Sequence, residues 1–112
     1  MKKNTITYED FVKLDFRIGT VSFAEPVEKS DRLLALTVDL GEDYGKREIL
    51  AGVAQFYKAE ELVGKKLIFL ANLEHRKMMG RESQGMMIAV DHDSRPILIE
   101  VDTQVENGAT LK

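Results

Sequence analysis

The sequence predicts an all-β fold, a small five-stranded barrel with short helices and a C-terminal extension. Apolar and polar residues alternate from Leu34 to Leu40, which is the two-residue period of a strand with one buried face. Two more apolar runs, 67–71 and 86–90, flank a polar segment that contains Gly80 and Gly85. That arrangement is typical of two strands joined by a long, flexible loop.

Length and composition indicate one domain that spans residues 1–112. The chain has room for a single modest core, and its hydrophobic fraction of 44% is ordinary for a globular protein. It has no cysteine, so neither a disulfide nor a thiolate metal site is expected. The first residues lack the apolar stretch of a signal peptide, and no run is long enough to span a membrane. We therefore expect a soluble cytoplasmic protein without membrane contacts, cofactors or bound metal.

The N-terminal part predicts a short helix and then a strand. Thr7 and Asp10 have the spacing of a capping box, so a helix is expected from Tyr8 to about Lys13. Alternation from Phe16 to Ala24 predicts the first strand, and Gly19 within it suggests a bulge or a sharp bend.

A hairpin, a second short helix and further strands follow. Strand 34–40 should pair with strand 46–50 across the turn 41–45, and a helix is expected around 56–63. The remaining extended segments are expected at 65–72, 85–90 and 97–101. Five strands with a helix between the third and the fourth are the order of an OB-fold, although the pattern alone leaves other small barrels open.

The charge distribution favours a restricted nucleic-acid footprint. A net charge of −3 argues against a protein that coats nucleic acid indiscriminately. Residues 58–81, however, contain six cations and three anions, whereas residues 91–112 contain two cations and five anions. Within the basic region Arg76, Lys77 and Arg81 lie on the glycine-containing connection, where we expect them to be exposed; the alternative is an ordinary solvated loop.

Segment 71–86 resembles one family, the tRNA-binding domain at the C-terminus of bacterial methionyl-tRNA synthetases and its free-standing relatives. The family's form is close to A-N-L-K-P-x-K-M-x-G-x-x-S-x-G-M, and the matching residues are Ala71, Asn72, Leu73, Lys77, Met78, Gly80, Ser83, Gly85 and Met86. The similarity extends over about Phe11 to Leu111 and includes a Y-x-x-E-E-L-x-G segment at 57–64. Glu74-His75 departs from the family's Lys-Pro, which implies weaker binding.

The resemblance implies that the 71–86 segment contacts RNA. Ser83 and Gln84 would hydrogen-bond exposed bases while Met86 lies against a base face, whereas the pattern alone favours a turn entering a strand. Asn72 either pins the loop or touches RNA, and the first role is favoured. Arg17 matches the family's D-x-R-V-G and could bind phosphate on a barrel face, or pair with Asp15 or Asp39. Two further candidates for the same surface are Arg32, where the family has Lys, and Arg47.

What the resemblance implies for function is a non-catalytic tRNA-binding module. It would act free-standing or in trans as a methionyl-tRNA synthetase beta subunit, with tRNA and an aminoacyl-tRNA synthetase as its expected partners. Relatives form homodimers, and an apolar segment suits such an interface here: Ile97, Leu98, Ile99 and Val101. The alternative is a CsaA-like export chaperone that binds unfolded polypeptides. No activating partner accompanies His75 or His92, so we do not expect an enzyme.

Overall fold

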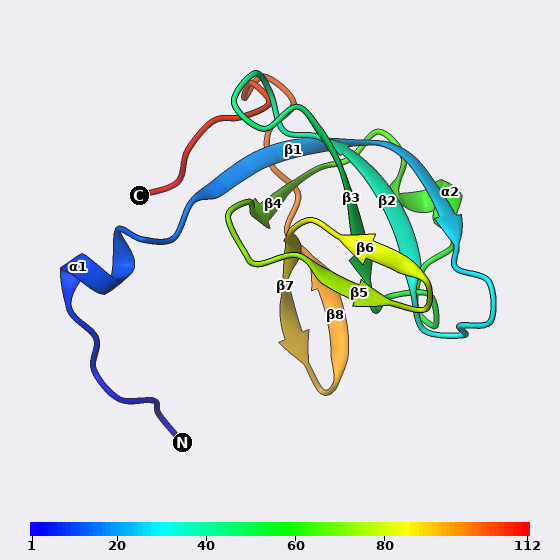
Figure 1. The fold of residues 1–112 in the computed structure, drawn as a ribbon, viewed down its shortest axis with the longest axis horizontal. Helices are drawn as coiled ribbons and strands as arrows, with labels where there is room; N and C mark the ends of the chain where they lie inside the picture. The colour runs from blue at the N-terminus through cyan, green and yellow to red at the C-terminus, as the bar shows by residue number, and fades with distance from the viewer.

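The strands of the computed structural model, which describes residues 1–112, form an all-β, OB-like barrel (Figure 1). Six strands make one antiparallel sheet in the order β3-β2-β1-β4-β7-β8, and β5 and β6 form a separate hairpin. The elements are α1 (Tyr8–Phe11), β1 (Phe16–Pro26), β2 (Leu34–Asp39), β3 (Lys46–Ala51), α2 (Ala59–Leu62), β4 (Lys66–Leu70), β5 (Arg76–Met78), β6 (Arg81–Ser83), β7 (Met86–His92) and β8 (Arg95–Leu98).

The long strand β1 curves the sheet, because its two halves pair with different neighbours. Residues 16–20 pair with β4 and residues 20–26 pair with β2. The register shifts between Val21 and Phe23, so the bulge lies there and the expected position at Gly19 is wrong. Gly19 instead allows close packing, since a Cβ there would lie 2.6 Å from Cγ1 of Val38.

The core follows the alternation predicted for the second strand. Leu36 and Val38 of β2, Ile49 of β3 and Phe69 of β4 are fully buried inside the barrel. Leu62 of α2 is also fully buried, and this short helix contacts β1 at one end of the barrel. The strands expected at 16–24, 34–40, 46–50, 65–72 and 85–90 are therefore confirmed, whereas the helices expected at 8–13 and 56–63 are both shorter, as α1 and α2.

The N-terminal arm, residues 1–14, stands clear of the barrel (Figure 1). Its helix α1 has the expected capping box between Thr7 and Asp10, yet none of its residues is buried. Asn72 fixes the root of the arm: its Nδ2 donates to the carbonyl of Lys13 at 2.7 Å and its Oδ1 accepts from the backbone N–H of Asp15 at 2.9 Å. Asn72 therefore has a structural role, as the sequence favoured. It holds the backbone of the arm, however, and not that of the following loop.

The expected long loop between β4 and β7 is wrong, because residues 76–83 form the hairpin β5–β6. Its two-residue turn consists of Met79 and Gly80, whose φ angles are 51° and 79°. Positive φ at both turn positions matches the twist of a tight hairpin. The basic side chains of this region therefore lie on a β-hairpin and not on a flexible loop.

The C-terminal apolar segment is largely used by its own barrel. β8 ends at Leu98, earlier than expected, and Leu98 packs against the core. Ile99 and Val101 are half-buried, whereas Ile97 is 39% exposed. Of the four residues expected at a dimer interface, only Ile97 presents a large apolar surface to solvent.

Candidate nucleic-acid interface

Arg81 is bound by two carboxylates, so its expected exposure is wrong. Its guanidinium donates to Glu48 at 2.6 and 3.2 Å and to Glu25 at 3.0 Å, and its side chain is 28% exposed. The hydrogen bonds to Glu48 and then to Glu25 raise the pKa of Arg81 above its ordinary value. Arg81 therefore fastens the β5–β6 hairpin to β3 and β1.

Ser83 and Gln84 connect the same hairpin to the free edge of β3. The hydroxyl of Ser83 accepts from the backbone N–H of Leu50 at 2.9 Å and donates to the carbonyl of Gly85 at 3.0 Å. The side-chain oxygen of Gln84 accepts from the N–H of Glu48 at 3.0 Å, and the N–H of Gln84 donates back to Glu48 at 2.8 Å. Ser83 is only 4% exposed. Both residues therefore satisfy the backbone of an edge strand, which leaves Ser83 little surface for RNA.

Arg17 is likewise engaged within the protein. It donates to Asp15 at 2.7 Å and to Asp43 at 3.0 Å, with a side chain that is 13% exposed. Arg17 therefore forms the ion pair with Asp15 that was expected as an alternative to phosphate binding. Its other carboxylate partner is Asp43 and not Asp39. The hydrogen bond from Arg17 holds the pKa of Asp15 below its usual value, and the hydrogen bond between Asp15 and Tyr44 raises the pKa of Tyr44.

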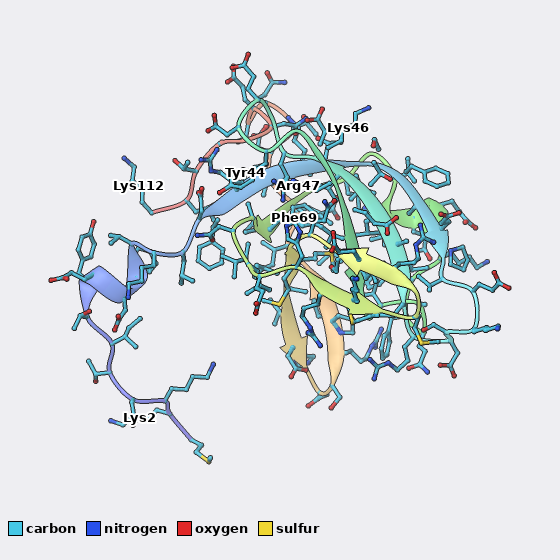
Figure 2. The ribbon with its side chains drawn as sticks, viewed as in Figure 1. Lys2, Tyr44, Lys46, Arg47, Phe69 and Lys112 are labelled. Carbon is cyan, nitrogen blue, oxygen red and sulfur yellow. The ribbon has the colours of Figure 1, made fainter.

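Arg47 lies in a cation–π stack that the sequence did not reveal. The Tyr44 ring has the guanidinium of Arg17 and that of Arg47 each 5.2 Å from its centroid, and Figure 2 shows Tyr44 and Arg47 side by side. Arg47 has no carboxylate partner, and its Nη1 lies 3.3 Å from Nε2 of His75. A guanidinium only donates, so Nε2 of His75 can take part in a hydrogen bond with Arg47 only as an acceptor; the other ring nitrogen, Nδ1, lies 3.5 Å from Glu82. Arg47 is half-buried, and its Nε donates to the carbonyl of Tyr44 at 3.2 Å.

Three other candidate cations are without an ion pair or a side-chain hydrogen bond: Arg32, Arg76 and Lys77. All three are exposed. Side chains alternate along β5, so Arg76 lies on the same face as Met78 and Lys77 lies on the opposite face. Lys77 is directly across from Glu82 of β6. Arg76 therefore faces the barrel, whereas the charge of Lys77 is partly offset by its cross-strand neighbour.

Arg32 and Arg76 border one hollow of about 350 Å³, together with Met86. They are its only charged residues, so the hollow combines two unpaired cations with an apolar lining. Met86 is 43% exposed at its rim. The structure thus brings three of the predicted residues together. Met78, Met87 and Pro96 also line this hollow and were not predicted as binding residues; the adjacent Met86-Met87 pair could have indicated Met87.

No cluster of three or more histidine or acidic side chains is arranged to hold a metal ion. His92 and Asp93, in the Asp-His-Asp stretch, are widely exposed at the β7–β8 turn. The structure also has no helix of the length and apolarity needed to cross a membrane.

Comparison with known proteins relates the chain to one family of domains. Residues 16–110 match the family described as "Putative tRNA binding domain". The chain is 44% identical over 111 residues to the methionine–tRNA ligase of Methanothrix thermoacetophila, an alignment that covers 99% of this chain and 16% of the ligase. The chain thus spans only a small part of the curated relatives that it matches.

Two solved structures share the whole fold. A methionyl-tRNA synthetase related protein (MetRS related protein) from Pyrococcus horikoshii superposes with a TM-score of 0.92 at 36% identity, covering 98% of this chain and 100% of that one. The chaperone CsaA from Bacillus anthracis superposes with a TM-score of 0.85 at 25% identity, covering 97% and 100%.

Proposed function

The chain belongs to the tRNA-binding domain family, and we propose that it binds tRNA without catalysing a reaction on it. The observation that carries this proposal is the separation of its arginines into two groups. Arg17 and Arg81 are each neutralised by two carboxylates, whereas Arg32 and Arg76 are unpaired and border one hollow. Unpaired guanidinium groups can bind phosphates without first breaking an internal ion pair.

The proposed interface consists of the β5–β6 hairpin, the loop before β2, the start of β3 and the start of β7. Arg32, Arg76 and Met86 form its centre, and Lys77 and Arg47 extend it. A small number of phosphate contacts is consistent with the net charge of −3, and it makes recognition depend on the shape of the RNA rather than on bulk charge. Ser83, Gln84, Asn72, Arg17 and Arg81 would act indirectly, by holding these elements in place.

Acting in trans is the proposed mode of use. The MetRS related protein of Pyrococcus horikoshii is a chain of this size, and the methionine–tRNA ligases carry the same domain as part of a larger protein. We propose that the chain presents tRNA to an aminoacyl-tRNA synthetase, either as a beta subunit or as a free-standing tRNA-binding protein.

The second candidate function is that of an export chaperone, which the likeness to CsaA and the methionine-lined hollow favour. A competition assay separates the two functions. We expect tRNA to bind with an affinity that falls linearly with salt on logarithmic axes. An unfolded polypeptide should displace tRNA poorly. Efficient displacement by the polypeptide, with little dependence on salt, would instead identify the chaperone.

We further propose that the chain forms a homodimer. The arm carries exposed apolar side chains that do not reach the barrel core, among them Tyr8, Phe11 and Val12, and Ile97 is exposed on β8. A two-fold interface would cover such surfaces, because apolar area of this kind is costly to leave in water.

At micromolar concentration, sedimentation equilibrium should give the mass of a dimer. Phe11→Glu and Ile97→Glu should each favour the monomer, since a charge buried without a partner is strongly unfavourable. Val63→Glu is the matched control: Val63 is 46% exposed beside α2, away from both segments, and this variant should remain dimeric. A wild-type protein that sediments only as monomer would contradict the proposal.

A further inference from the structure

A second hollow continues the one beside Arg32 and Arg76. It has a volume of about 250 Å³ and is bounded by Phe56 and Val90, which are 40% and 48% exposed. Three residues line both hollows, which therefore adjoin and are together called the groove: Gly52, Ala89 and Pro96.

The two ends of this groove differ in chemistry. The first end has two unpaired guanidinium groups above a lining that includes Met78, Met86 and Met87. The second end presents the aromatic ring of Phe56 and has Asp91 as its only charged lining residue. A flexible methionine side chain adapts to a flat apolar surface, and an exposed aromatic ring can stack on a base.

A nucleotide with an unpaired base matches both properties, because it joins an anionic phosphate to a flat apolar face. A polypeptide would use the apolar lining but offers no regularly placed anion for the two arginines. A base-paired helix cannot use the groove, because its bases are stacked on one another and present only their edges. Charge complementarity therefore favours unpaired RNA.

Building on the proposed tRNA binding, we infer that this groove holds an unpaired segment of RNA at least two nucleotides long. One base enters the methionine-lined end with its phosphate beside Arg32 and Arg76. The next base lies on Phe56. The arginines bind phosphate in any RNA, whereas the groove adds affinity only where the RNA has unpaired nucleotides.

Gly52 offers a direct way to block the groove. A Cβ at this position would meet no atom within 4 Å, and the backbone is not in the left-handed region that strains other residues. In Gly52→Leu, the added side chain should occupy the junction of the two hollows with little change in the melting temperature. Gln55→Leu is the matched control, because it adds apolar bulk at an exposed neighbour that lines neither hollow.

The probes are a short blunt RNA duplex and the same duplex with two unpaired nucleotides at one end, the last carrying a fluorescent adenine analogue. Wild type and Gln55→Leu should bind the overhang probe about tenfold more tightly than the blunt duplex, and the emission of the analogue should change on binding. Gly52→Leu should bind the two probes equally, and the emission of the analogue should not change.

Equal binding of the two probes by the wild type would overturn the inference while leaving phosphate-based tRNA binding intact. A preference that persists in Gly52→Leu would also overturn it, since the unpaired nucleotides would then lie elsewhere. If an unfolded polypeptide binds the wild type but not Gly52→Leu, and the overhang gives no advantage, the groove belongs to polypeptides. Failure of the wild type to bind tRNA at all would instead refute the proposed function itself.

Discussion

Replacing Arg32 and Arg76 together by alanine should weaken tRNA binding by about 1–3 kcal/mol, the effect of losing two phosphate contacts. Both side chains are exposed and unpaired, so their removal breaks no internal interaction. The free energy of unfolding should therefore change by no more than about 0.5 kcal/mol. Fluorescence anisotropy with labelled tRNA and urea denaturation measure the two quantities on the same preparation.

The control for net charge is the double variant Arg95→Ala, Lys112→Ala. These two cations are also exposed, and neither lines a hollow. The control should retain nearly wild-type affinity, although it loses the same number of charges. If both double variants weaken binding equally, tRNA responds to the overall charge of the protein and the proposed interface is wrong.

Ser83→Ala should lower the free energy of unfolding by about 1–3 kcal/mol, because it leaves the backbone N–H of Leu50 without a partner in a buried position. The loss should appear as a lower urea midpoint. Among folded molecules the affinity for tRNA should be unchanged, since Ser83 has almost no exposed surface.

Ser22→Ala is the matched control for this stability effect. Its hydroxyl donates to the carbonyl of Thr37 at 3.2 Å in an exposed position, so water can replace it, and the change in stability should stay within about 0.5 kcal/mol. A Ser83→Ala protein with unchanged stability and weakened tRNA binding would show that Ser83 contacts RNA directly, as the sequence motif implied.

Local patterns were sufficient to predict most of the barrel. The alternation in β2 and the capping box of α1 depend on neighbouring residues, and both are present in the structure. The hairpin β5–β6 was missed because its turn is formed by Met79 and Gly80, and methionine is not a residue that signals positive φ. A two-residue turn at Asn-Gly would have been recognised.

The candidate interface was harder to predict, because ion pairing joins residues that are distant in sequence. Arg76 and Arg81 lie five positions apart and looked alike, yet Arg81 meets Glu25 and Glu48 whereas Arg76 is free. Nothing in the local sequence indicates which carboxylate will face which guanidinium. The division of the arginines between fold and binding surface therefore became visible only in three dimensions.

The salt dependence of tRNA binding tests this division most directly. The slope of log affinity against log salt should be shallower in the Arg32→Ala, Arg76→Ala variant than in the wild type by about 1.4–1.8, the change expected when two phosphate contacts are lost. The Arg95→Ala, Lys112→Ala control should keep the wild-type slope. An unchanged slope in the Arg32, Arg76 variant would contradict the account, because the unpaired arginines would then not be the groups that bind the phosphates.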